Sequence, residues 1–150
     1  MTHHLVILQP RYINAILSGG KSIECRLSRH RIEPFGAVHR GDTLWLKHSG
    51  GLIVARARVR SVAFFTPATG DLAGHIASRY GDLIKATPQF FRRHRNARYA
   101  TIIHIGRVDR LQPFGVLKSD RRAWVVLSGP PNSSSPVSPR KPRRRQSYTK

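Results

Sequence analysis

The sequence predicts an α+β fold, a small and mostly closed β-barrel of five to six strands decorated with two to three helices. Two observations indicate this class. Apolar or alternating runs typical of strands recur through the first 127 residues, and helical patterns interrupt them after the first run and again later. Beyond residue 127 the composition changes sharply. A chain of 150 residues has the size of one domain with one core.

The N-terminal elements follow from local patterns. Residues 4–8 form a short apolar run that predicts a strand, and Pro10 suits the first turn of a helix that the glycine pair 19–20 ends. Residues 21–27, KSIECRL, alternate between apolar and polar side chains, which is typical of a half-buried strand. Residues 28–40 predict a loop.

The rest of the domain is expected to contain four strands and two helices. Strands are predicted within residues 41–48, 52–65, 99–114 and 122–127, the first two forming a hairpin. A helix is predicted from Thr69 to about Ile84, with Asp71 near its start, and a shorter helix begins at Pro88 and runs through QFFRRHRN. Trp45 and Trp124 both lie in alternating strands, so we expect them in the core.

A segment of different composition follows Leu127. Residues 128–150 hold five prolines, six serines, six cations and no acid, and they have almost nothing to bury. We therefore expect a folded domain over residues 1–127 and a disordered basic tail over 128–150. Residues 1–127 still carry 21 cations against seven acids, so the domain is basic without the tail.

The charge balance indicates the kind of partner. Lys and Arg number 27 against seven acids, a net charge of +20, and nucleic acid is the polyanion that such a surface attracts first. An anionic membrane is the alternative, but the sequence has no long basic amphipathic helix, no membrane-spanning run and no signal-peptide pattern. The single Cys25 excludes an internal disulfide and a cysteine-based zinc cluster. A single cysteine fits a reducing, cytoplasmic setting. The eight histidines are scattered, so we expect no metal site. We also expect a monomer with no cofactor.

The motif G-x-K-x-x-E-x-R appears at Gly19, Lys21, Glu24 and Arg26, and a Gly-Asp turn, Gly41 and Asp42, follows before the next strand. With the order strand, helix, motif, loop and long strand, this pattern resembles the ASCH domain, a member of the PUA-like barrel superfamily. The resemblance extends in layout over roughly residues 4–127.

The resemblance implies a cleft beside the barrel that recognises RNA or a nucleotide. Its expected lining is Tyr12, Lys21, Ser22, Glu24 and Arg26. Some ASCH proteins are hydrolases of an acetylated cytidine nucleoside, and others are described as ribonucleases. The acetylcytidine hydrolases use a threonine three residues after the lysine. Glu24 stands there in this chain, which argues against transferring that mechanism.

Read without the family, the motif allows two interpretations. Alternation places Glu24 and Arg26 on one strand face, where a carboxylate between Lys21 and Arg26 keeps the cations from repelling one another. The two could form a purely structural ion pair with Lys21 solvated, or all three could line a ligand cleft. Tyr12 could wall such a cleft or pack in an apolar stripe. Ser22 shares the face of Glu24, but an ion-paired carboxylate is a weak base for activating it.

Other cations are candidate nucleic-acid contacts. Three arginines alternate along one strand face and span roughly 13 Å, and three others lie beside Phe90 and Phe91, which could stack bases or anchor the helix. A third group lies in the tail. The candidates are Arg56, Arg58, Arg60, Arg92, Arg93, Arg95, Arg143, Arg144 and Arg145.

The sequence is interpreted first as an RNA-binding protein, a module with a nucleotide cleft at the motif, and two alternative functions remain open. One is a hydrolase acting on RNA or a modified nucleoside, with Lys21 and Glu24 as the catalytic residues. The other is a basic component of a larger ribonucleoprotein with no small-molecule cleft.

Overall fold

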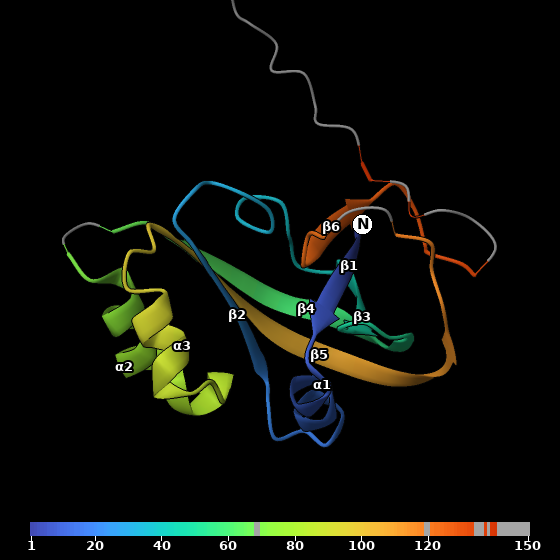
Figure 1. The fold of residues 1–150 in the computed structure, drawn as a ribbon, viewed down its shortest axis with the longest axis horizontal. Helices are drawn as coiled ribbons and strands as arrows, with labels where there is room; N and C mark the ends of the chain where they lie inside the picture. The colour runs from blue at the N-terminus through green and yellow to red at the C-terminus, as the bar shows by residue number, and fades with distance from the viewer. Residues whose placement is uncertain (68–69, 119–120, 134–136, 138, 141–150) are drawn as a thin grey trace, which may run out of the picture.

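The computed structural model describes residues 1–67, 70–118, 121–133, 137 and 139–140. Within this part, six strands form one sheet in the order β2-β5-β4-β3-β1-β6 (Figure 1). The strands are β1 (His3–Leu8), β2 (Ile23–Ser28), β3 (Thr43–His48), β4 (Ile53–Phe65), β5 (Tyr99–Phe114) and β6 (Trp124–Leu127). The helices are α1 (Pro10–Leu17), α2 (Leu72–Ile84) and α3 (Pro88–Arg93).

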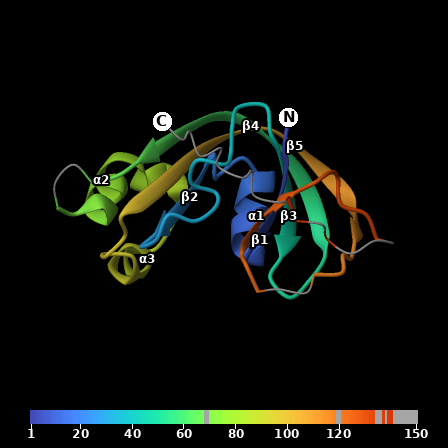
Figure 2. The same ribbon diagram turned by 90° about the horizontal axis from the view of Figure 1, so that it is seen from above.

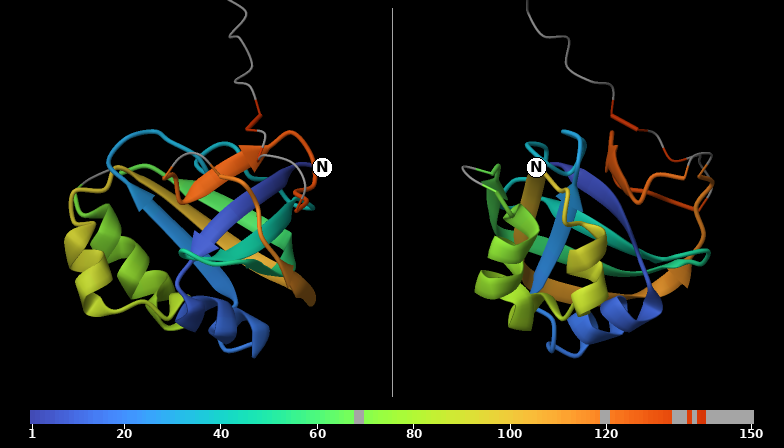
Figure 3. Two further views of the ribbon diagram at one scale, coloured as in Figure 1. Left: turned by 45° about the vertical axis from the view of Figure 1, so that its right-hand side comes forward. Right: turned by 60° about the vertical axis from the view of Figure 1, so that its left-hand side comes forward.

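The sheet is a half-barrel, so the predicted α+β class is confirmed but the barrel is more open than expected. β1 pairs with β3 in parallel, and the other neighbouring strands pair antiparallel. The sheet curls strongly, as both views of Figure 3 show. Among the described residues no backbone pairing joins β2 to β1 or β6. A seam therefore remains between β2 on one side and β1 with β6 on the other.

The curvature is built into the long pair β4–β5. Their register shifts at three places between Ile53 and Ser61, which marks bulges that bend and twist the strands. At one of them Gly106 lies so close to β4 that a Cβ on it would stand 3.2 Å from the carbonyl oxygen of Arg58. A larger residue there would require β4 to shift by a few tenths of an ångström.

Three apolar clusters of described residues pack on this sheet, and two of them lie on opposite faces of it. Ile103 belongs to the cluster inside the barrel, which α1 closes with Ile13 and Ile16, and the adjacent Ile102 belongs to the cluster beneath α2. Figure 2 shows α2 and α3 together at one end of the β4–β5 pair, away from β3. The apolar face of β2, namely Ile23, Cys25 and Leu27, packs into this second cluster as the alternation predicts.

The helices begin and end where side chains satisfy their backbone groups. Asp71 caps α2 by accepting a hydrogen bond of 2.9 Å from the Gly74 amide, so α2 begins at Leu72. Thr69 lies outside the described residues. α3 ends at Arg93, earlier than the expected helix through QFFRRHRN, and the His94 ring nitrogen Nδ1 donates to the Phe90 carbonyl at 2.8 Å. No helix in the described part is long and apolar enough to cross a membrane.

Part of the segment expected as a tail contacts the domain. The Val137 amide donates to the Leu117 carbonyl at 2.8 Å, and the Arg140 amide donates to the Val126 carbonyl at 2.7 Å. Pro139 forms an isolated bridge with Leu127. Pro139 and Arg140 therefore contact β6, and Val137 contacts the chain that follows β5. Arg143, Arg144 and Arg145 lie outside the described residues.

A buried polar cluster holds β1, β3 and β6 together. His4 and Asp42 are 0% and 3% exposed, and their Nε2 and Oδ2 atoms are 2.8 Å apart. The Trp124 indole N–H donates to His4 Nδ1 at 3.0 Å. Since Nδ1 accepts this bond, the proton of the neutral ring resides on Nε2 and is donated to Asp42. Asp42 also accepts hydrogen bonds from the backbone amides of Thr2 and His39.

The surroundings of this polar cluster lower the pKa of His4 and the pKa of Asp42. Burial lowers the pKa of His4, and this outweighs the opposing effect of the Asp42 carboxylate. For Asp42, burial alone would raise the pKa, but the hydrogen bonds from His4, Thr2 and His39 bring it below its usual value. Folding therefore favours a neutral His4 and an ionised Asp42.

Stability is expected to fall as the pH is lowered from 8 to 5, because His4 binds a proton in the unfolded chain more readily than in the folded one. Such a histidine contributes a slope of up to about 1.4 kcal/mol per pH unit between its lowered folded-state pKa and its unfolded-state pKa. His3 contributes with the same sign, since burial also lowers its pKa. Denaturant unfolding of His4→Gln at several pH values should give a shallower slope than the wild type. His30→Gln, at an exposed position, should keep the wild-type slope. Equal slopes for His4→Gln and the wild type would contradict this account.

Candidate functional site

The candidate site lies in the seam between β2 and β1. The turn after α1 positions Lys21 in this seam. Gly19 has a φ of +82°, a conformation that glycine adopts without strain, and the Lys21 amide donates to the Ala15 carbonyl at 3.0 Å. The chain thus reverses at the end of α1 and enters β2 two residues later.

Lys21 is buried, with 3% of its surface exposed. Its ammonium donates to the carbonyl oxygens of Ile23 at 2.7 Å and of Ile84 at 2.5 Å, and it stands 3.4 Å from Glu24 Oε2. An ammonium has three hydrogens, and these partners use all three. Lys21 therefore ties the end of α2 to the start of β2, and in this arrangement it has no lone pair with which to accept a proton.

Glu24 lies between the two cations of the motif and is 6% exposed. Oε2 faces Lys21, and Oε1 accepts a hydrogen bond of 3.0 Å from Arg26 Nε. Two cations thus fix the orientation of the carboxylate. The structural interpretation of the motif had Lys21 solvated, and the burial of Lys21 contradicts that part of it.

Arg26 crosses the seam. Its Nη2 donates to the Ile7 carbonyl in β1 at 3.2 Å, and its guanidinium carbon lies 5.3 Å from the ring centroid of Trp124 in β6. One side chain from β2 thereby contacts both strands on the opposite side of the opening.

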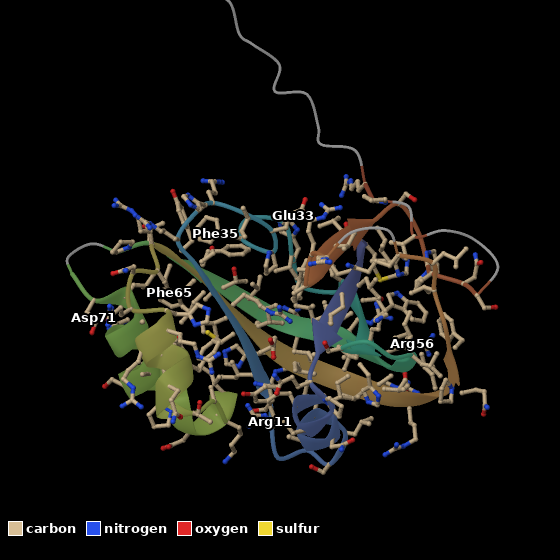
Figure 4. All side chains as sticks on the ribbon, in the orientation of Figure 1. Arg11, Glu33, Phe35, Arg56, Phe65 and Asp71 are labelled. Atoms are coloured by element: carbon tan, nitrogen blue, oxygen red, sulfur yellow. The ribbon has the colours of Figure 1, made fainter. Side chains whose placement is uncertain are left out.

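A cavity of about 310 Å³ opens beside these residues, and we call it the first cavity. Its walls come from β1, α1, β2, the end of α2, and α3. Four cations, Arg11, Lys21, Arg26 and Arg93, face one acid, Glu24, so the lining is strongly positive. Figure 4 shows Arg11 beside α1, near the lower end of the gap between β2 and β1.

Aromatic rings complete the walls of the first cavity. Tyr12 comes from α1, and its ring centroid lies 5.5 Å from the Lys21 ammonium nitrogen and 4.7 Å from the Arg11 guanidinium carbon. Phe90 and His94 come from α3, with ring centroids 4.5 Å apart. His94 Nδ1 donates to a carbonyl, so Nε2 of the neutral ring is an acceptor. Rings from two different helices, α1 and α3, thus line one positive cavity and offer stacking surfaces for a flat ligand.

Cys25 also touches the first cavity but is not a nucleophile. Burial, with a smaller contribution from Glu24, raises the pKa of its thiol to about 12. At neutral pH the thiol stays protonated, and the thiolate is the reactive form.

The structure brings together four of the five residues expected in the cleft. Tyr12, Lys21, Glu24 and Arg26 line the first cavity. Ser22 is exposed, does not line it, and contributes a backbone carbonyl that accepts from Ile105 at 2.9 Å.

The expected arginine contacts fall into two groups. Arg93 lines the first cavity, whereas Arg92 and Arg95 are exposed outside it. Phe90 and Phe91 both pack against the core beneath α2.

The side chains of Arg56, Arg58 and Arg60 are exposed at alternate positions of β4, away from the first cavity. The strand has no interleaved acid, but its partner β5 supplies Asp109, whose carboxylate lies 3.4 Å from Arg56 and 3.1 Å from Arg107. Arg58 Nη1 donates to the Gly41 carbonyl at 3.1 Å. The carboxylate of Asp109 therefore partly neutralises this arginine-rich face, which the sequence of β4 alone does not indicate.

Arg11 and His94 are lining residues that the sequence analysis did not single out. Arg11 directly precedes Tyr12 at the start of α1, and His94 follows Phe90 by four residues, which places both beside candidate aromatics. These positions beside Tyr12 and Phe90 are the features of the sequence from which both lining residues could have been predicted. Among the described residues, no group of three or more metal-ligating side chains comes together.

Comparisons with known proteins agree on the fold. The family model of the ASCH domain matches residues 6–80. The crystal structure of ASCH from Zymomonas mobilis is similar with a TM-score of 0.58 and 19% identity, covering 74% of this chain and 71% of that one. A mutant of the same protein gives a TM-score of 0.60 at 19% identity, covering 76% of both chains. No curated protein matches the chain.

Lys21→Met is expected to lower the free energy of unfolding by about 3 kcal/mol or more, because it leaves two buried carbonyls without a donor and removes one counterion of Glu24. Lys85→Met is the matched control, since Lys85 is exposed and directly follows Ile84, and it should change stability by no more than about 0.5 kcal/mol. Denaturant unfolding measures both. Similar losses of free energy of unfolding in the two variants would show that Lys21 does not stabilise the contact between α2 and β2.

Proposed function

The chain belongs to the ASCH domain family, and we propose that it binds single-stranded RNA, with one nucleotide held in the first cavity. ASCH domains are commonly thought to bind RNA. The observation that carries the proposal is the composition of the first cavity, in which a fixed buried carboxylate, stacking rings and four cations face one space.

The cations suit the phosphate of a nucleotide. Arg11 and Arg93 are exposed, line the first cavity and come from different helices, α1 and α3. A guanidinium forms charge-assisted hydrogen bonds with phosphate oxygens, often in pairs. The remaining surface of a chain with a net charge of +20 adds non-specific attraction for the polyanion.

The rings and the carboxylate suit the base. Tyr12 and Phe90 offer apolar faces, and stacking on an aromatic ring stabilises a bound base by about 1–3 kcal/mol. The carboxylate of Glu24 accepts hydrogen bonds, so it favours the amino or imino edge of a base. Because Lys21 and Arg26 fix its orientation, it is preorganised for this contact. Phosphate contacts would position the RNA, and Glu24 would discriminate among bases.

Binding is a better account of this geometry than proton transfer by Lys21. A general base needs a free lone pair within reach of its substrate, and the three donors of Lys21 are directed to Ile23, Ile84 and Glu24. Its role in the proposal is to position Glu24. A functional test should therefore change residues at the rim of the first cavity, where a loss of binding is separable from a loss of folding.

Arg93→Gln is expected to weaken RNA binding and to reduce the dependence of log K on log salt concentration by about 0.7, the contribution of one phosphate contact to a single strand. Fluorescence anisotropy of a labelled single-stranded oligoribonucleotide across a salt series measures both quantities. Free ribonucleoside monophosphates should compete in a saturable manner with RNA for the wild type, and less well for Arg93→Gln.

Arg79→Gln is the control, because Arg79 is an exposed arginine on α2 that does not line the first cavity. It should leave competition by mononucleotides unchanged. If Arg93→Gln and Arg79→Gln bind RNA and mononucleotides equally well, the first cavity is not the site.

A further inference from the structure

A second cavity, of about 610 Å³, lies on the other side of Arg26. Arg26 and Leu27 line both cavities. The rest of the second cavity comes from the end of β2, from Thr101 in β5, from the loop around Arg31 and Glu33, and from the chain entering β6. The side chain that crosses the seam thus divides it into two compartments that adjoin each other.

The two compartments extend from Arg26 in opposite directions along the seam. Arg11 lines the first cavity and Glu33 lines the second. Figure 4 shows Arg11 beside α1 at one end of the gap between β2 and β1, and Glu33 at the other end, on the loop that joins β2 to β3. A chain lying in the seam would pass from one cavity over Arg26 into the next.

The second cavity differs from the first in what it offers a ligand. Its lining contains three arginines, Arg26, Arg31 and Arg122, against one acid, Glu33. Its single aromatic lining residue is Trp124, which is 4% exposed and so almost fully buried, unlike the half-buried Tyr12 of the first cavity. The second cavity therefore supplies guanidinium groups for an anion but no open ring on which a base could stack.

Arg31 is the cation of this cavity that can be tested most cleanly. Its side chain is exposed, and its guanidinium carbon lies 5.2 Å from the ring centroid of Phe35. Phe35 in turn packs edge-on against Phe64 and Tyr99, with centroid distances of 5.2 and 5.0 Å. This aromatic support orients Arg31 without burying it, so removing its charge should not disturb the fold.

We propose that the second cavity is a phosphate subsite that holds the phosphodiester of the nucleotide next to the one in the first cavity. The inference rests on the proposed RNA binding. It adds a path for the bound RNA, which would lie along the seam and cross it over Arg26. Base recognition would then be confined to the first cavity, and the second would contribute affinity that depends on a neighbouring phosphate and not on its base.

The test compares mononucleotides with dinucleotides. The probes are the 5′-monophosphates of the four ribonucleosides and the four 5′-phosphorylated homodinucleotides, each competing with labelled RNA for the intact chain. For the best base, the wild type should bind the dinucleotide roughly tenfold more tightly than the mononucleotide, or better, which corresponds to one charge-assisted phosphate contact. Arg31→Gln should remove most of that gain and leave mononucleotide binding unchanged.

Two variants make the result specific. Arg79→Gln is a close match for Arg31→Gln, because Arg79 is also exposed and also lies 5.2 Å from an aromatic centroid, that of Tyr80, but on α2 and outside both cavities. It should keep the full dinucleotide gain. Arg93→Gln should weaken both kinds of probe, since Arg93 lines the first cavity alone.

The outcomes separate this inference from the proposed function. If mononucleotides compete and Arg93→Gln weakens them, but the dinucleotide gain is absent or survives Arg31→Gln, the second subsite is overturned and the first cavity stands. If no mononucleotide competes with the wild type, the proposed function of the first cavity fails and the subsite fails with it. Thermal melting that is equal for Arg31→Gln and the wild type shows that the loss is one of binding.

Discussion

The structure depends on the carboxylate of Glu24, which is held between two cations in the seam of an unclosed barrel. Lys21 connects it to the last carbonyl of α2, that of Ile84, 63 residues after Lys21, and Arg26 connects it to β1 and β6. In a closed barrel a ladder of backbone hydrogen bonds would join these strand edges. Here one arginine makes the connection, and without Glu24 two buried or half-buried cations would stand near each other with no counterion.

The same constraint creates the candidate site. A seam bridged by one side chain leaves space on both sides of it, and both cavities are lined by the groups that hold the seam together. From the sequence alone, a structural ion pair and a ligand cleft are alternative interpretations of Glu24 and Arg26. The structure combines them, because the ion pair fixes the orientation of a carboxylate that also lines the first cavity.

Local patterns predicted most of the fold, and the errors occurred where distant segments meet. The alternation of β2, the proline that begins α1 and the Asp71 cap of α2 are read directly from neighbouring residues. The burial of Lys21 could not be read in this way, since its partner Ile84 belongs to a distant helix. The pairing of Arg56 with Asp109 depends on the register of two strands that contains several bulges, which no local pattern specifies. The open seam depends on that curvature as well.

The measurement that tests the central claim most directly is a double-mutant cycle on the free energy of unfolding, with Glu24→Gln, Arg26→Gln and the double variant. If Glu24 holds Arg26 across the seam, the two substitutions should be coupled by about 1 kcal/mol or more, since residues in one buried network are not additive. Effects that add to within about 0.3–0.5 kcal/mol would show that the two side chains act independently. The seam would then be closed by something other than this pair.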